Sequence, residues 1–381
     1  MRLGIDASNL RAGGGITHLV EFLKAADPLA EGFTEILVWG GRETLRRLDE
    51  RLWLIKSEQN LLNKSLLFRI FWQVFLLSGL AKGSKCDVLF VPGGTFTGNF
   101  QPVVAMSRNM LPFESKELLR YGASPICFRL FLLRYLQSMT FRRVRGIIFL
   151  TSYAKQKVLG LLGPIKGVVN IIPHGLGTSS FLPPREQATI EKYSQERPFR
   201  LIYVSIVDVY KHQWKVAEAV FILRKSGMPV MLDLIGPAYP PALKRLQQTL
   251  HHVDPKGEFI RYIGELPYNG LPTRYAEADL CLFASSCENM PNILLEGMAS
   301  GLPIACSDRG PMPEVLGDTG VYFDPEDPLD IARAIKEMID SPQLRASKSK
   351  GSFERARSYS WARCAKETFK FLASMAEQSK G

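Results

Sequence analysis

The sequence has few cysteines, and their spacing gives no cysteine metal site or redox pair. There are six, with no CxxC pair and no cluster with histidine: Cys86, Cys127, Cys281, Cys287, Cys306 and Cys364. Two thiols a few residues apart are the usual signature of such sites. Reduced thiols in a cytoplasmic protein are therefore expected, and the start of the chain predicts a strand instead of a signal peptide.

Long apolar runs are also missing. The longest, Leu66 to Leu80, is broken by Arg69 and Gln73. It is shorter than the roughly 20 residues that a membrane-spanning helix needs. A transmembrane segment is therefore not expected here.

Length and charge indicate the general organisation. A chain of 381 residues is too long for one ordinary core, so two domains are expected. The net charge of +11 is uneven, since residues 1–180 hold 23 Lys and Arg against 12 Asp and Glu, whereas the rest holds 25 of each. This asymmetry predicts an anionic partner for the front half, either nucleic acid or an anionic membrane surface.

Strand and helix patterns alternate along the chain, which predicts parallel, doubly wound sheets. We expect two tandem Rossmann-like domains whose ligand crevices face each other across a cleft. The first covers residues 1–183, and the polar, Pro-flanked segment 183–199 has the composition of a linker. The second covers 184–355, and a C-terminal helix in 356–381 is expected to pack back on the first domain.

The front domain begins with a strand, a glycine-rich turn and a helix. The strand runs from Leu3 to Ser8, and the helical pattern starts at Ile16. Between them, Gly14 and Gly15 would let backbone amides approach a diphosphate closely. The turn matches neither a dinucleotide-binding fingerprint nor a P-loop, so a plain tight turn is the alternative.

Two segments of the front domain mix bulky apolar residues with arginines. We predict helices over 63–80 and about 117–141, the second followed by more arginines up to 145. A helix of this kind suits an anionic bilayer, where arginines meet phosphates and the apolar face enters the interface. The alternative is a core helix whose arginines reach outward. Nucleic acid explains the charge less well, since no aromatic stacking platform accompanies it.

Loops that follow parallel strands line the ligand crevice of such a sheet. Two of these loops follow the expected strands 87–91 and 102–106, and a later turn follows 167–172. They supply the acceptor-side candidates Gly94, Arg108, Asn109, Glu114 and His174. Solvated loop residues, and a structural role for the histidine, are the alternatives.

The stretch from Leu280 to Cys306 carries the clearest pattern. A strand to Phe283 leads into a small polar loop, Pro291 can open a helix, and Gly301 can end it before the next strand. A helix start directly after a strand favours an anion. Glu288 and Glu296 bracket it, and carboxylates suit adjacent hydroxyls of a sugar or ribose. The pattern therefore predicts a sugar-nucleotide site.

These residues resemble a known family, the retaining sugar-nucleotide-dependent glycosyltransferases of the GT-B fold in family four. The signature is a Glu, seven residues and a Glu ahead of Gly-Leu-Pro, here Glu288, Glu296 and Gly301-Leu302-Pro303. By resemblance, the first carboxylate contacts the transferred sugar and the second the ribose. The same resemblance assigns the remaining donor-side positions to Lys211, His212, Gly264, Glu265, Asn289, Met290, Pro291 and Asn292.

Two positions depart from the family pattern. The family's Val-Gly-Arg is replaced at Ser205 and Ile206, which leaves Lys211 alone, or with His212 or Arg309, as the cation near the leaving diphosphate. The family's loop histidine is also absent, and Asn109 could supply a hydrogen bond there but no acid–base chemistry. Glu288, Lys211 and Asn109 are thus the predicted catalytic residues.

The resemblance implies transfer of a sugar from a UDP- or GDP-linked donor to a saccharide or lipid-linked acceptor of a bacterial envelope, with retention by same-face attack. The absence of any Asp-x-Asp supports chemistry without a metal, and no cofactor beyond the nucleotide sugar is expected. The enzyme is expected in the cytoplasm or on the inner membrane face. A nucleotide-sugar epimerase and a catalytically weakened sugar-nucleotide-binding protein remain as alternatives.

Overall fold

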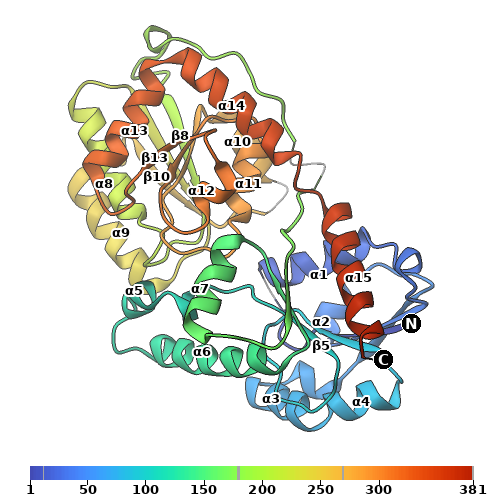
Figure 1. Cartoon of the computed structure of the whole chain (residues 1–381). Helices are drawn as coiled ribbons and strands as arrows, with labels where there is room; N and C mark the ends of the chain where they lie inside the picture. The colour runs from blue at the N-terminus through green and yellow to red at the C-terminus, as the bar shows by residue number, and fades with distance from the viewer. Residues whose placement is uncertain (12, 178–180, 268–269, 380–381) are drawn as a thin grey trace. The chain divides into compact units, whose positions relative to one another are not determined.

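A computed structural model describes residues 1–11, 13–177, 181–267 and 270–379 (Figure 1). The chain forms two compact units. Unit 1 contains Met1–Leu118, Gly122–Gly175 and Tyr359–Gly381, and unit 2 contains Leu119–Tyr121 and Leu176–Ser358. The main division therefore lies at residues 175 and 176, compared with the expected 183 and 184, and the C-terminal helix belongs to unit 1.

Unit 1 is built on a seven-stranded parallel sheet in the order β3-β2-β1-β4-β5-β6-β7. The strands are β1 (Arg2–Asp6), β2 (Glu35–Gly40), β3 (Leu54–Glu58), β4 (Val88–Val91), β5 (Val103–Met106), β6 (Gly146–Phe149) and β7 (Val168–Ile171). In the central strands every residue of β4, β5 and β6 is buried, because helices cover both faces. The predicted parallel sheet is confirmed, and β3 is an additional edge strand.

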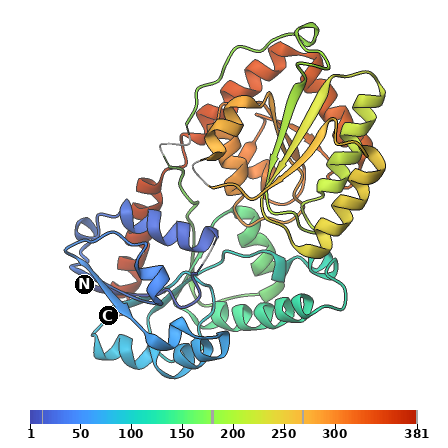
Figure 2. The same ribbon diagram turned by 180° about the vertical axis from the view of Figure 1, so that it is seen from behind.

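The helices of unit 1 are α1 (Gly14–Lys24), α2 (Arg42–Leu45), α3 (Leu66–Phe75), α4 (Leu77–Gly83), α5 (Ser115–Leu119), α6 (Pro125–Arg143), α7 (Ser152–Leu162) and α15 (Trp361–Glu377). Figures 1 and 2 show α1 and α15 on one face of the sheet and α3, α4 and α6 on the other. On the first face, Phe369 of α15 stacks on Phe22 of α1 with ring centroids 4.9 Å apart. The C-terminal helix thus completes the core of unit 1.

Both predicted arginine-rich helices are interrupted. The segment 63–80 forms α3 and α4 with a bend of 45° between them, and 117–141 forms α5 and α6 with a break before the Ser124 cap. Ser124 accepts a hydrogen bond from the Cys127 amide at 3.2 Å, and Pro125 suits the first helical position. Among the described residues no single helix is long and apolar enough to cross a membrane; the bent pair α3 and α4 reaches that length and composition together.

Unit 2 is built on a six-stranded parallel sheet in the order β10-β9-β8-β11-β12-β13. Its strands are β8 (Phe199–Val204), β9 (Val230–Ile235), β10 (Ile260–Gly264), β11 (Leu280–Phe283), β12 (Ile304–Ser307) and β13 (Val321–Phe323). The order reverses between β8 and β11, and such a switch point opens a crevice at the carboxyl ends of the strands. The predicted parallel sheet of the second domain is confirmed, and the strand predicted to end at Phe283 is β11.

The helices of unit 2 are α8 (Gln213–Lys225), α9 (Pro240–Val253), α10 (Leu271–Glu277), α11 (Asn292–Ala299), α12 (Met312–Leu316), α13 (Pro328–Asp340) and α14 (Pro342–Ala356). In Figure 1, α8, α9 and α13 lie on one face of the sheet and α10, α11 and α14 on the other. Ser341 separates α13 from α14, and its hydroxyl caps α14 by accepting from the Leu344 amide at 3.1 Å.

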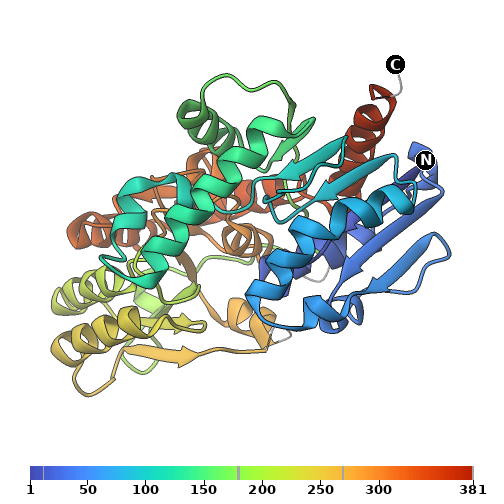
Figure 3. The ribbon, with the colours of Figure 1, turned by 90° about the horizontal axis from the view of Figure 1, so that it is seen from below.

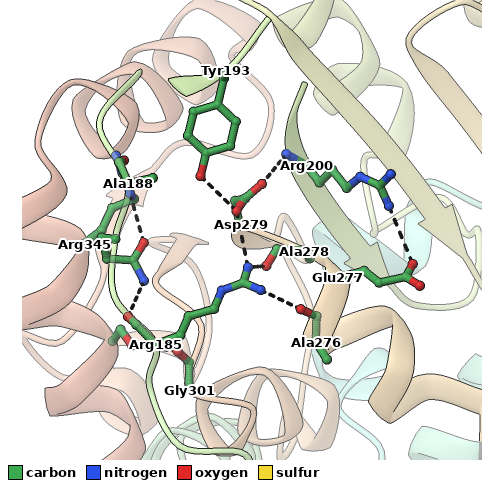
Figure 4. Close-up of polar contacts among 12 residues, drawn as sticks. Arg185, Ala188, Tyr193, Arg200, Ala276, Glu277, Ala278, Asp279, Gly301 and Arg345 are labelled. Carbon is green, nitrogen blue, oxygen red and sulfur yellow. Dashed lines mark hydrogen bonds and ion pairs between the residues drawn. The ribbon is translucent and has the colours of Figure 1, made fainter. Parts of the chain in front are cut away.

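The segment predicted as a linker is packed onto unit 2 (Figure 4). Arg185 donates to the Ala276 carbonyl at 2.5 Å and lies 3.3 Å from the Asp279 carboxylate. Tyr193 donates to the same carboxylate at 3.0 Å. The fully buried Arg345 donates to the Gln187 side chain at 3.1 Å. Polar composition was misleading here, because Arg185, Gln187 and Tyr193 each make a specific contact with unit 2.

Candidate active site

Two loops of unit 2 meet at the switch point of its sheet. Residues 205–212 follow β8 and residues 284–291 follow β11, and these strands are neighbours in the sheet. The Ser286 amide donates to the Tyr210 carbonyl at 2.9 Å, which ties the loops together. Parallel strands end at the same edge, so residues about 80 apart in sequence share one site.

Lys211 and Glu288 form an ion pair where these loops meet. Their side chains are only 7% and 16% exposed, so little water screens the pair. The Lys211 ammonium also lies over the rings of Tyr210 and Phe283, at 5.1 and 5.2 Å from their centroids. Tyr203 fixes the backbone by donating to the Lys211 carbonyl at 2.7 Å. Two predicted catalytic residues are therefore in direct contact.

His212 and Arg309, the two predicted helpers of Lys211, are otherwise engaged. Burial lowers the pKa of His212 to about 4, aided by the charge of Arg120, so the ring is neutral at pH 7. Its Nε2 atom lies 2.9 Å from the Ser286 hydroxyl. Arg309 pairs with Asp324 at 2.6 Å. The expectation that either assists as a cation is not supported by these contacts, which leave Lys211 as the cation beside Glu288.

The amide end of helix α11 comes directly after the loop formed by residues 284–291. Pro291 is its N-cap residue, and neither a capping side chain nor an acidic residue stands in its first turn. Asn289 and Met290 are buried in the preceding loop, and Glu296 is half-buried in the second turn. The predicted helix start is thus confirmed, and its positive dipole end is unopposed by a carboxylate in that turn.

The departures from the family pattern lie in the β8–α8 loop. Ile206 is 38% exposed, and the Ser205 hydroxyl accepts from Gln213 at 2.8 Å. Gly236 lies against this loop with φ of 142°, and a Cβ added there would stand 2.2 Å from the Ser205 carbonyl oxygen. Sequence reasoning missed this glycine, since only the close approach of two loops explains it.

A second missed group is the contact between Tyr121 and Asp208. The Tyr121 hydroxyl donates to the Asp208 carboxylate at 2.9 Å, and Arg120 pairs with Glu326 at 2.8 Å. Burial raises the pKa of Asp208. The segment Leu119–Tyr121 therefore belongs to unit 2. Asp208, which Tyr121 contacts, lies three residues before Lys211 in the sequence. Only the tertiary fold brings a residue from between α5 and α6 here.

Two predicted donor-side residues, Gly264 and Glu265, lie at the end of β10 and directly after it. Gly264 has φ of 82°, in the left-handed region that glycine tolerates, and its carbonyl accepts from the Gly236 amide at 2.8 Å. Glu265 follows on an exposed position. The described residues contain no group of three or more His, Cys, Asp or Glu side chains placed to hold a metal ion.

In unit 1, Gly14 and Gly15 are the first residues of α1, whereas the prediction placed them in a turn before the helix. Arg108 reaches them from the loop after β5 and donates to the Gly15 carbonyl at 3.3 Å. Burial lowers the pKa of Arg108 to about 10, which still leaves it charged at pH 7. The glycines predicted on the donor side and the arginine predicted on the acceptor side are therefore in contact with each other.

The other front-half candidates make local contacts within unit 1. The Asn109 side chain accepts from the Leu111 amide at 3.1 Å. Glu114 accepts a hydrogen bond from Tyr153. His174 is buried, with its ring centroid 4.7 Å from that of His18 and 5.7 Å from that of Trp361.

Gly94 has φ of 75°, and a Cβ there would stand 2.8 Å from the Met106 carbonyl oxygen. Its backbone conformation and the lack of space both require glycine. Together with the contacts of Asn109, Glu114 and His174, this gives each of the four residues a local structural role in unit 1.

Comparison with known proteins was made for sequence and for fold. Residues 198–341 match the family described as glycosyl transferases group 1. The O-antigen chain mannosyltransferase B of Escherichia coli is 33% identical over 110 residues, which cover 29% of each chain. The first curated relatives are matched over less than a third of their own length.

Two solved structures match over nearly the whole chain. Sucrose-phosphate synthase from Thermosynechococcus elongatus has a TM-score of 0.75 at 15% identity, covering 99% of this chain and 100% of that one. Anabaena HepE in complex with UDP and glucose has a TM-score of 0.70 at 16% identity, covering 98% and 100%. Residues 198–341 are therefore similar to the glycosyl transferases group 1 family, and the chain has the two-domain GT-B fold of these neighbours.

Proposed function

We propose that this protein is a retaining glycosyltransferase that moves a sugar from a nucleotide-sugar donor to a saccharide or lipid-linked acceptor. The observation that carries the proposal is the Lys211–Glu288 pair beside the uncapped amide end of α11, with Glu296 one turn further on. An ammonium and helix amides suit the diphosphate, and two carboxylates suit sugar and ribose hydroxyls.

The proposed chemistry follows from charge. Breaking the sugar–diphosphate bond places negative charge on the leaving phosphate and positive charge on the sugar ring. Lys211 and the amides of α11 would stabilise the first, and Glu288 would hold the hydroxyls of the second. Because both side chains are largely shielded from water, these interactions act at a low effective dielectric. We propose same-face attack by the acceptor hydroxyl and no metal requirement.

The similarity to an O-antigen chain mannosyltransferase supports a role in bacterial envelope polysaccharide synthesis, and the UDP complex of a structural neighbour supports a nucleotide donor. We propose that the enzyme works in the cytoplasm, on the inner face of the membrane. The acceptor would then be presented at that surface.

Exposed apolar side chains on α3 and α6 support membrane binding by unit 1. Figure 3 shows both helices on the same face of the unit 1 sheet. On α3, Leu67 is 77% and Phe75 66% exposed, and on α6 Phe128 is 73% exposed. Arg129 and Arg143 are exposed on α6 among them. Apolar groups beside arginines fit the interface of an anionic bilayer.

Flotation with vesicles containing anionic lipid tests this surface. We expect Leu67→Asp with Phe75→Asp to abolish flotation, and Arg129→Glu with Arg143→Glu to weaken it at low salt. Leu329→Asp is the matched control, since Leu329 is 68% exposed on unit 2. Equal flotation of the wild type and the α3 variant would remove the membrane proposal.

The activity itself is tested by incubating the pure protein with UDP- and GDP-sugars, with and without acceptor and with EDTA. Hydrolysis or transfer supports the proposal, and the anomer of the product decides retention. Sugar isomerisation would indicate an epimerase. Binding without turnover would favour a sugar-nucleotide-binding protein, the alternative suggested by Ile206 in place of the family arginine.

A further inference from the structure

A cavity lies between helices α8, α9 and α13, on one face of the unit 2 sheet (Figure 1). Its volume is about 690 Å³, within the range of about 300 to 1,000 Å³ that is usual for small-molecule sites. The side chains that line it stand three or four residues apart on α8 and on α9, and residues with that spacing share one face of a helix. The lining contains neither Lys211 nor Glu288, so the cavity is not part of the candidate active site.

The α9 side of the cavity carries polar groups that the protein leaves unused. Arg245, Gln248 and His252 line it and are exposed, and none of the three side chains has a hydrogen bond or ion pair with the residues that the structure describes. The Arg245 guanidinium lies over the Trp214 ring, 4.2 Å from its centroid. Stacking fixes the plane of the guanidinium and leaves its five N–H donors for a ligand. One helix face therefore offers a row of hydrogen-bonding groups.

The α8 and α13 side of the cavity is mainly apolar. Phe221 and Ile222 are partly exposed on α8, and Leu329 at the start of α13 is 68% exposed. Apolar walls with a few placed polar groups are the usual lining of a site for an organic ligand. A sugar ring has apolar C–H faces and a rim of hydroxyls, so it can contact this side while it hydrogen-bonds to α9. An inorganic phosphate has no apolar face to place there.

The charges around the cavity balance. Glu218 is paired with Lys215 at 2.9 Å. Asp327 then stands opposite Arg245 in sign, and its carboxylate accepts from the Leu329 amide at 2.9 Å through one oxygen. A lining without surplus charge gives no advantage to an anion or a cation. A hydroxyl both donates and accepts, so it suits a carboxylate and a guanidinium in the same site.

We propose that this cavity binds a neutral oligosaccharide. The identity of the ligand rests on the proposed transferase function, whose acceptor and product are glycans. The side chains of Arg245, Gln248 and His252 bind the hydroxyls, and the apolar side contacts the faces of the sugar rings. A glycan held at this second site stays on unit 2 between transfers.

Fluorine NMR of the full chain tests the site without turnover. The chain has five tryptophans, of which Trp214 alone lies within 176–358, so 5-fluorotryptophan labelling gives a local reporter that Trp214→Phe identifies. We expect mannotetraose or maltotetraose to shift the Trp214 resonance, because the bound sugar contacts the guanidinium that covers this ring.

A pair of matched variants tests the row on α9. Gln248→Ala with His252→Ala keeps Arg245 over the reporter and should raise the Kd about tenfold, because two hydrogen bonds are lost. Gln247→Ala with His251→Ala is the control, since the same residue types are exposed one position earlier on α9 and do not line the cavity. The control should bind like the wild type.

The outcomes separate this proposal from the transferase function. Sugar binding that the Gln248 and His252 variant weakens supports the site even if no transfer is ever detected. Active transferase whose Trp214 resonance neither sugar moves at millimolar concentration would overturn this proposal alone, as would equal Kd values for variant and control. A shift caused by inorganic pyrophosphate and by neither sugar would also refute a neutral ligand. Should the double variant fail to fold, Arg245→Ala measured by calorimetry replaces it, and undiminished binding would then contradict the site.

Discussion

Removing the Lys211 charge is the most informative perturbation of unit 2. Lys211→Met keeps the apolar stem and deletes the ammonium, which leaves the Glu288 carboxylate 16% exposed and without its partner. It also deletes the contacts with the Tyr210 and Phe283 rings. The free energy of unfolding and the catalytic rate should both fall. The causes differ, and the two quantities can be measured separately.

The stability change follows from the burial of the pair. Breaking a buried ion pair on one side costs about 3 to 5 kcal/mol, and this pair keeps slight contact with water, so we expect about 3 kcal/mol. Lys211→Met combined with Glu288→Gln removes the stranded charge as well. The double variant should therefore lose about 2 kcal/mol less than the sum of the single variants. On the proposed function, kcat of Lys211→Met should fall about 100- to 1000-fold.

Urea unfolding measures the first quantity and sugar-nucleotide turnover the second. Lys215→Met is the matched control, because Lys215 pairs with Glu218 on the surface at 2.9 Å, with side chains 27% and 35% exposed. Such a pair contributes under about 1 kcal/mol. If Lys211→Met costs no more stability than the control, or if the single-variant costs simply add, the reasoning about a shielded pair is wrong.

Three further predictions concern the scaffold of unit 2. The folded-state pKa of His212, about 4, lies below the unfolded value near 6.5, so its stabilisation is present above pH 6.5 and is lost as the pH falls toward 4. Urea unfolding across this range should show that His212→Asn removes about 3 kcal/mol of the pH dependence of the unfolding free energy; an unchanged pH dependence would contradict this. Gly236→Ala should lower the melting temperature far more than Gly227→Ala, because both have positive φ but only the first meets backbone within 4 Å; equal shifts would contradict the clash. Arg185→Ala should speed limited proteolysis within residues 183–198, since its three contacts to 276–279 are lost; an unchanged cleavage rate would mean that these contacts do not hold the segment.

Much of the fold was predictable because its signals are local. The apolar run Leu280–Phe283 and the helix start at Pro291 depend on a few neighbouring residues, and the structure places them as expected. The errors occurred where composition was used alone. The 183–199 segment is polar, yet Arg185 and Tyr193 are polar in order to bind Asp279.

The candidate site was predictable in part for the same reason. Glu288 was predicted from the strand–loop–helix pattern and Lys211 from the resemblance to the family, and the structure brings them together. The contact of Tyr121 with Asp208 joins residues 87 apart, and no local pattern marks it. Asn109 and Glu114 fell in the right kind of loop, but their partners, the Leu111 amide and Tyr153, are set by packing.

The sequence by itself determined the two parallel-sheet domains and the helix start at Pro291, because hydrophobic period and helix-breaking residues act over a few positions. Tertiary structure alone decided which charged groups remain available. Arg309 and Glu114 are taken up by partners, His212 is held neutral by burial, and Lys211 is paired with Glu288. Charge availability depends on distant neighbours and on exclusion of water, which only the folded chain fixes.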